Sequence, residues 1–286
     1  GKAIIIVDAD ATVPALNVSG TGETALDNNG TIEDTQVDDS ATLTEGAVTL
    51  ESFLTKLAAG GEVSIAEDIG IYADPSHEET EFLVPMVTID KDTQLNLNGH
   101  TIYVDYNKSV SYLYCVLLFN INGADVVING EGGSIDTEMG NNECYGINIV
   151  NGGSLVVNGG TYNGALTAMQ VTQGELMIND GFFDLAPTCK SQVPHYAKYV
   201  VNCIDKNYKN GTANITIKGG TFVNFDPSAN PEGAGTSYLP FGYASEAFLQ
   251  ENGETWYMVQ TEWAAVPAWD GSIDTSWYND TDAQFT

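Results

Sequence analysis

Short runs in which apolar and polar residues alternate recur through the middle of the chain. The run Ser154–Gly164, SLVVNGGTYNG, has Leu155 and Val157 separated by one residue and followed by Asn-Gly-Gly, Thr and an aromatic residue. Alternation with a period of two predicts a strand with one buried face. The same template fits the apolar pairs Val63/Ile65, Leu95/Leu97, Val126/Ile128, Leu176/Ile178 and Ile215/Ile217.

The spacing of these copies distinguishes between repeat architectures. The second apolar residue stands at positions 65, 97, 128, 157, 178 and 217, so the intervals are 32, 31, 29, 21 and 39 residues. Propellers and helical repeats require a nearly constant interval, whereas a coil of parallel strands can vary its outer loops and keep its strands stacked. Further apolar runs at 116–121, 146–150 and 168–171 indicate about three short strands per coil. We therefore predict an all-β fold, a right-handed parallel β-helix built as a single-stranded solenoid.

The residues that follow each apolar pair predict the corners of the coils. They are Asn98, Asn129, Asn158, Asn179 and, in the last copy, Lys218. Asparagine tolerates the left-handed conformation of a tight corner and can hydrogen-bond to the equivalent residue one coil away. Glycines that follow supply the positive φ of a sharp bend.

Both ends of a solenoid have to be covered, because exposed terminal rungs promote aggregation. The run TLESFLTKLAAGG begins with a capping Thr49, has apolar residues at helical spacing and stops at Gly-Gly, which predicts an N-terminal capping helix. The Asn252-Gly253 pair predicts a C-terminal hairpin cap. The expected organisation is 1–48 as an acidic strand and lead-in, 49–225 as the β-helix with its capping helix, 226–262 as the C-terminal cap, and 263–286 as a linker or the start of a next module.

The charge of the chain excludes several classes of partner. Nine lysines, no arginine and 39 acidic residues give a formal net charge of -30. Such a chain repels polyanions, so we expect no nucleic-acid binding. The longest apolar run is too short to span a membrane, and the sequence shows no export signal, which we expect to have been removed.

Metal and cofactor sites are not expected either. The three histidines are scattered, and the four cysteines form no CxxC pair. We therefore predict no cofactor, apart from weak calcium binding to the acidic surface.

The cysteine spacing leaves two states open. Cys115 and Cys144 are 29 residues apart, close to one coil, so they form either a disulfide or two buried thiols, depending on the register. Cys189 and Cys203 flank an insertion that a second disulfide would close.

Several runs resemble the secreted, adhesin-like right-handed parallel β-helix proteins of gut bacteria, within the pectin-lyase-like fold. They are LAAGGEVSIAEDI, KDTQLNLNGHTI, the repeated NGGT corners, GGTFVNFDPSANPEGAGTSY and the tail AWDGSIDTSWYNDTDAQF. The resemblance covers residue 49 to the end. It implies an extracellular or cell-surface location, and a non-catalytic, monomeric module of a multi-domain bacterial protein, an adhesin-like stalk or ligand-binding segment with glycans or host surface proteins as partners.

The fold also hosts other functions, so two alternatives stay open. One is a carbohydrate-binding or polysaccharide-cleaving, lyase-type domain. The other is a phage-type receptor-binding fibre. Since the chain has no arginine and no paired-aspartate signature, we predict no catalytic residues.

A basic insertion is the candidate ligand-binding region. Residues 185–218 contain five lysines and one aspartate, in contrast to the acidic remainder of the chain. Tyrosines in the insertion suit stacking on sugars, and lysines suit binding a carboxylate or sulfate. The candidate residues are Lys190, His195, Tyr196, Lys198, Tyr199, Lys206, Tyr208 and Lys209.

Overall fold

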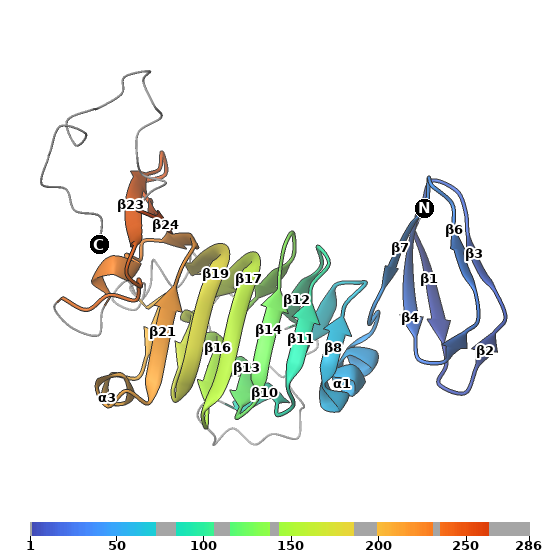
Figure 1. Cartoon of the computed structure of the whole chain (residues 1–286), viewed down its shortest axis with the longest axis horizontal. Helices are drawn as coiled ribbons and strands as arrows, with labels where there is room; N and C mark the ends of the chain where they lie inside the picture. Colours follow the sequence, from blue (N-terminus) through green and yellow to red (C-terminus); the bar gives the residue numbers. More distant parts are fainter. Residues whose placement is uncertain are drawn as a thin grey trace, which may run out of the picture.

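Strands make up most of the residues that the structure describes, and most of their pairings are parallel. The computed structural model describes residues 2–72, 84–105, 115–137, 143–185, 199–230 and 235–262 (Figure 1). Among these residues the helices are α1 (Leu50–Ala59), α3 (Asp205–Lys209) and the short 3-10 helix Pro227–Ala229. The predicted all-β class is confirmed.

The N-terminal 45 residues form a small unit of parallel strands. Its strands are β1 (Lys2–Val7), β2 (Thr12–Val13), β3 (Leu16–Val18), β4 (Glu23–Asn28), β5 (Thr31–Ile32), β6 (Thr35–Val37) and β7 (Thr42–Glu45). They pair as a sheet in the order β1-β4-β7 and as the two pairs β2-β5 and β3-β6. Partners are 19 to 21 residues apart, as in Lys2 opposite Glu23 and Glu23 opposite Thr42. Seven strands therefore occupy the stretch for which we expected one acidic strand and a lead-in.

Strands β8 to β22 lie on three faces, which we name A, B and C. Face A contains β8 (Gly61–Ser64), β11 (Thr93–Asn96), β14 (Asp125–Asn129), the first parts of β17 (Gly153–Gly164) and β19 (Gly174–Leu185), and β21 (Ala213–Ile217). Face B contains β9 (Ile69–Ile71), β12 (Thr101–Val104), β15 (Ser134–Asp136), the second parts of β17 and β19, and β22 (Gly220–Val223). Face C contains β10 (Val84–Ile89), β13 (Cys115–Asn122), β16 (Glu143–Val150), β18 (Thr167–Val171) and β20 (Val201–Cys203).

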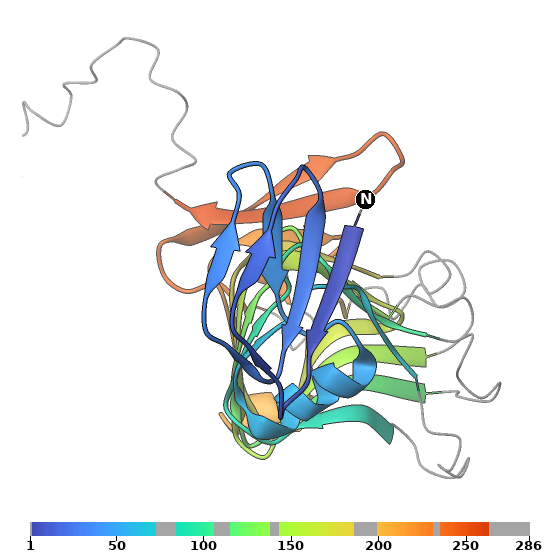
Figure 2. The same ribbon diagram turned by 90° about the vertical axis from the view of Figure 1, so that its right-hand side faces the viewer.

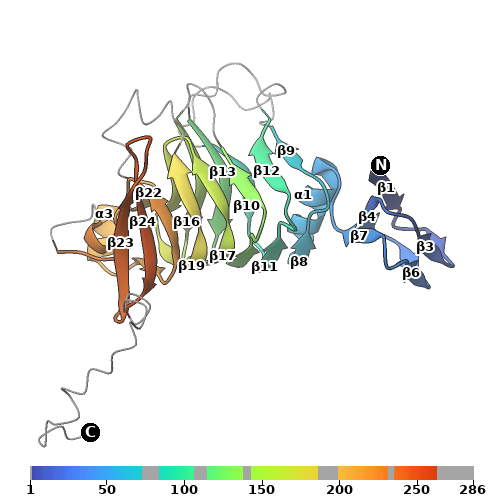
Figure 3. The ribbon, with the colours of Figure 1, turned by 90° about the horizontal axis from the view of Figure 1, so that it is seen from above.

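The chain visits these faces in a fixed order. It runs through A, B and C five times and then through β21 and β22. On every face each strand pairs in parallel with the strand of the next pass. Figure 1 shows the face A strands side by side in one row, and Figure 3 shows the same row from above.

One hydrophobic core lies between the three faces. The second apolar residue of each sequence repeat is buried, with at most 2% of its surface exposed, and all belong to this core: Ile65, Leu97, Ile128, Val157, Ile178 and Ile217. The prediction that alternate aliphatic side chains share a single interior is confirmed.

A stack of aromatic rings continues the core under face B. Phe183 lies between Tyr162 and Phe222, with ring centroids 5.0 and 4.8 Å away and interplanar angles of 9° and 6°. The three residues occupy the same register position on adjacent strands. Burial raises the pKa of the Tyr162 hydroxyl above its usual range, and this hydroxyl donates to the Gly159 carbonyl at 2.9 Å.

The register of one rung differs from the sequence alignment by two residues. Leu95, not Leu97, lies opposite Ile128. The reason is that a slip of two residues keeps every side chain on the same face, so burial alone does not reveal it.

The same slip changes the predicted asparagine ladder. Amide hydrogen bonds of 2.8, 3.0 and 2.8 Å link Asn96, Asn129, Asn158 and Asn179 on successive strands. The ladder therefore exists, but Asn96 and not Asn98 begins it. Asn98 instead takes the left-handed corner, at φ 50°.

The helix and the hairpin that the sequence predicts at the two ends are both present. Thr49 is the N-cap of α1, its hydroxyl accepts from the Ser52 amide at 3.1 Å, and the helix buries Phe53 and Leu57. Figure 2 shows α1 lying across one end of the strands. At the other end, β23 (Tyr243–Leu249) and β24 (Thr255–Thr261) form an antiparallel hairpin that continues face B through β22.

The N-terminal unit is joined to the main core through β7 and α1. Ala47 pairs in parallel with Ile65, so the chain continues directly from the small unit onto the first rung of face A. Lys56 on α1 lies 3.3 Å from the buried carboxylate of Asp27, and Lys2 lies 2.8 Å from Glu67. None of the helices in the described part of the chain has the length and hydropathy required to cross a membrane.

Candidate functional site

Face C departs from strict alternation of inward and outward side chains. In β13 the consecutive residues Leu118 and Phe119 both belong to the core. In β18 the consecutive residues Ala168 and Met169 also both belong to the core. Position 146 of β16, between them, is a glycine, where an added Cβ would lie 2.4 Å from the Ala168 carbonyl oxygen. Two consecutive inward residues leave no outward side chain over that part of the sheet, as in a β-bulge.

This irregularity separates two outward rows of side chains. On one side, Tyr145 and Thr167 are register partners. On the other side, Asn148, Gln170 and Asn202 are register partners on β16, β18 and β20. Residues of both rows, Tyr145, Thr167 and Asn202, line a pocket on the outer surface of face C.

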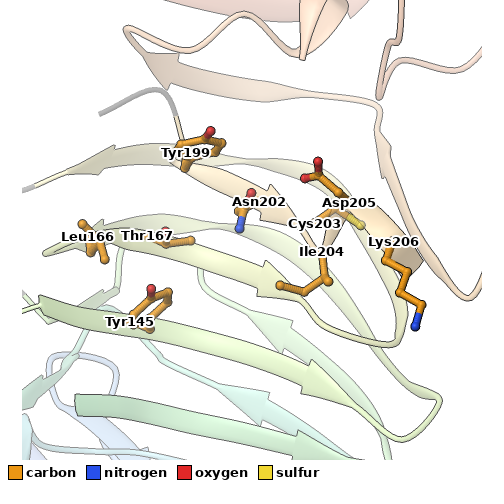
Figure 4. Close-up of a pocket in the computed structure, with 9 residues that line it drawn as sticks. All are labelled: Tyr145, Leu166, Thr167, Tyr199, Asn202, Cys203, Ile204, Asp205 and Lys206. Carbon is orange, nitrogen blue, oxygen red and sulfur yellow. The ribbon is translucent and has the colours of Figure 1, made fainter. Parts of the chain in front are cut away.

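This pocket has a volume of about 480 Å³ and lies over β16, β18 and β20 (Figure 4). We call it the face C groove. It is lined by Tyr145, Leu166, Thr167, Tyr199, Asn202, Cys203, Ile204, Asp205 and Lys206.

The groove combines aromatic surface with polar groups. Tyr145 and Tyr199 are partly buried and stand near one end, with Thr167 between them (Figure 4). They belong to passes two strands apart, which corresponds to about 9.5 Å at ~4.8 Å per strand. Asp205 and Lys206, at the start of α3, stand at the opposite end (Figure 4). Aromatic rings with a few amide, hydroxyl and charged groups are typical of a small-molecule or sugar site.

The structure brings two of the eight predicted ligand-binding residues into this groove, Tyr199 and Lys206. Tyr208 instead packs against the core, with its ring 6.0 Å from that of Tyr238. Lys209 lies 3.6 Å from the Asp205 carboxylate, an ion pair within α3. The other four predicted residues, Lys190, His195, Tyr196 and Lys198, lie outside the described residues.

Other groove residues were missed by the sequence reasoning. Tyr145, Thr167 and Asn202 come from three different passes of the chain. The sequence shows the alternation and the tyrosines, but it does not show which residues of these passes lie next to one another on face C.

The cysteine register is offset by one residue. Cys144 lies opposite Val116, and Cys115 lies opposite Glu143, in the parallel pairing of β13 with β16. This is the offset that the sequence left open, and the choice between a disulfide and two buried thiols stays open as well. Cys203 is buried in the core, while Cys189 lies outside the described residues.

Metal-binding side chains do not gather in the part of the chain that the structure describes. No group of three or more His, Cys, Asp or Glu residues there is placed to hold a metal ion. Comparison of the chain with models of protein families, with curated proteins and with solved structures gives no match. The geometry of the face C groove is therefore the basis for a proposed function.

Proposed function

We propose that this chain is a right-handed parallel β-helix module of a secreted or cell-surface bacterial protein, and that its face C groove binds carbohydrate without cleaving it. The β-helix assignment is supported by the repeated order of faces A, B and C and by parallel pairing between successive passes. Right-handedness is supported by the strong preference of parallel crossover connections for that hand.

The observation that carries the binding proposal is the pair Tyr145 and Tyr199 on either side of Thr167. Sugar rings present flat apolar faces that pack on aromatic rings, and their hydroxyls exchange hydrogen bonds with amide and hydroxyl side chains. Partly buried rings lose little freedom on binding, because the strands already hold their positions.

A binding role is favoured over hydrolysis by the small number of acids in the groove. Glycoside hydrolysis normally uses two carboxylates on opposite sides of the bond that is cleaved. Of the groove residues that the structure describes, Asp205 alone carries a carboxylate, and Lys209 is paired with it. The net charge of -30 suits a module that must stay soluble while displayed on a larger protein.

Binding to the intact chain tests this proposal. A glycan array should identify a bound oligosaccharide, and titration calorimetry should then show a loss of about three- to tenfold in affinity for Tyr145→Ala and for Tyr199→Ala. Tyr103→Ala is the matched control, because Tyr103 is a 37% exposed tyrosine of β12 on face B, away from the groove.

Three results would contradict the proposal. They are binding to no glycan on the array, binding that survives both groove substitutions, and release of an unsaturated product detected by ultraviolet absorbance. The last result would indicate that the groove cleaves polysaccharide as a lyase.

A further inference from the structure

A row of polar side chains leads along face C into the groove. Register partners place Asn120, Asn148, Gln170 and Asn202 on four successive strands, β13, β16, β18 and β20. Asn148 and Gln170 are only 8% and 7% exposed, although they lie in an outward row. Buried amides need hydrogen-bond partners, so the row is ordered by its own contacts.

These contacts run in one direction. The Asn202 Nδ2 donates to the Gln170 Oε1 at 3.2 Å. The Gln170 Nε2 in turn donates to the Thr172 hydroxyl at 3.4 Å and weakly to the Asn148 Oδ1 at 3.5 Å, and the Thr172 hydroxyl donates to the same Asn148 oxygen at 2.8 Å. Gln170 and Asn202 thus both turn their amide nitrogens toward the previous strand.

The direction decides which atom Asn202 offers to a ligand. One hydrogen of its Nδ2 is donated to Gln170, and its Oδ1 acceptor is turned away from β18 (Figure 4). An amide oxygen accepts hydrogen bonds and does not donate them. A ligand group that approaches the Asn202 Oδ1 is therefore selected for its ability to donate.

The acidic remainder of the chain favours the same chemistry. Asp205, Lys206 and Lys209, the charged side chains described at the groove, sum to +1, and Lys209 lies 3.6 Å from the Asp205 carboxylate. The chain as a whole carries -30, which lowers the concentration of anions around the molecule. A ligand carboxylate beside the Asn202 Oδ1 would meet another acceptor, and the acidic remainder of the chain would repel it at longer range.

We infer that the face C groove selects neutral, hydroxyl-rich oligosaccharides over chains of uronic acids, and that Gln170 is a positioning residue that holds the Asn202 acceptor toward the ligand. This inference rests on the proposed carbohydrate binding and adds its specificity. It departs from our expectation that lysines of the basic insertion grip a carboxylate or sulfate.

The first experiment compares ligands on the intact wild-type chain. Neutral hexose oligosaccharides and uronic-acid oligosaccharides of equal length are titrated at low and at physiological salt. We expect the neutral ligands to bind at least tenfold more tightly. Equal or tighter binding of the uronates overturns the inference but leaves the proposed function standing, whereas no binding of either ligand overturns both.

The second experiment changes the acceptor. Asn202→Asp keeps an acceptor at this position, and Gln170 can rotate its amide to donate to it, so neutral ligands should bind within about threefold of wild type. Asn202→Leu removes the acceptor and should weaken binding of neutral ligands about tenfold. Asn120→Asp adds the same charge to the same row outside the groove. It should change the affinity neither for neutral ligands nor for uronate ligands.

The third experiment tests the positioning role. Gln170→Glu still accepts from the Asn202 amide, so the preference for neutral ligands should persist. Gln170→Leu releases the Asn202 amide, and the preference for neutral over uronate ligands should fall at least threefold. Circular dichroism confirms that each variant is folded, and a preference that reverses in Gln170→Glu, or stays unchanged in Gln170→Leu, overturns the role of Gln170.

Discussion

Replacing Phe183 by alanine should strongly destabilise the protein, because this ring is at the centre of the aromatic stack. Phe183 has no exposed surface, and rings from the previous and the next strand lie on both sides of it at 5.0 and 4.8 Å. Truncation of a buried phenylalanine costs about 3–5 kcal/mol in free energy of unfolding. The neighbouring rings belong to strands held ~4.8 Å apart, so they cannot close the cavity. We therefore expect a loss of about 4 kcal/mol, a large part of the ~5–15 kcal/mol of a typical domain.

The adjacent residue supplies a matched control on the same strand. Phe182 points outward and is partly exposed, and its ring meets the edge of Trp256 at 5.1 Å. Phe182→Ala should cost only about 1 kcal/mol. Urea unfolding followed by far-ultraviolet circular dichroism measures both variants. Losses that agree within about 1 kcal/mol would show that inward and outward positions of β19 are energetically equivalent, which would refute the reasoning.

Four further variants test other contacts. Asn129→Ala removes two ladder hydrogen bonds and should lower the free energy of unfolding by about 1–2 kcal/mol in a urea titration. An unchanged free energy of unfolding would show that the ladder does not stabilise the fold. Thr49→Ala should cost about 1 kcal/mol in thermal unfolding, and Thr49→Ser should restore most of it. Lys56→Met leaves the Asp27 carboxylate buried without its cation and should lower the free energy of unfolding by about 3 kcal/mol. Asp27→Asn in the same chain should recover part of this loss, and added salt should change the loss little. Burial raises the pKa of Tyr162 above its ordinary value of about 10, so the tyrosine contributes stability that is complete below that pH and declines as the pH rises above it. The stability difference between wild type and Tyr162→Phe should therefore narrow above pH ~10, and a widening difference would contradict the assignment.

The core and the caps could be predicted from the sequence because their signals are local and strong. Period-two alternation identified buried positions such as Val157 and Ile178, and the capping Thr49 and the Asn252-Gly253 turn marked the two ends. The register of Leu97 could not be predicted in the same way, since a slip of two residues leaves the burial pattern unchanged. It is fixed by the loop at the corner, whose length the pattern does not constrain.

The N-terminal strands after β1 were missed for a different reason. Strands such as β2 and β5 contain two residues each, too few for alternation to be recognised among Thr, Asp and Asn. Their parallel pairing becomes visible only as an offset of 19 to 21 residues, as between Thr12 and Thr31.

The groove was predicted in part. Composition alone marked the basic insertion, which supplies Tyr199 and Lys206. The other half of the groove depends on face C offsets of 28, 22 and 32 residues between successive strands, as between Cys115 and Glu143, Tyr145 and Thr167, and Met169 and Val201. Loops of unequal length produce these offsets, and no local pattern specifies them.

The parallel offsets also have a consequence for how the molecule assembles. Each pass finds its partner 19 to 39 residues away along the chain, from β1 at the N-terminus to β21 near the C-terminus. The entropy of closing a loop grows only slowly over this range, so every docking step has a similar barrier. Folding can therefore start at any well-packed rung and propagate toward both ends, and its rate should depend on the step length rather than on the total number of residues.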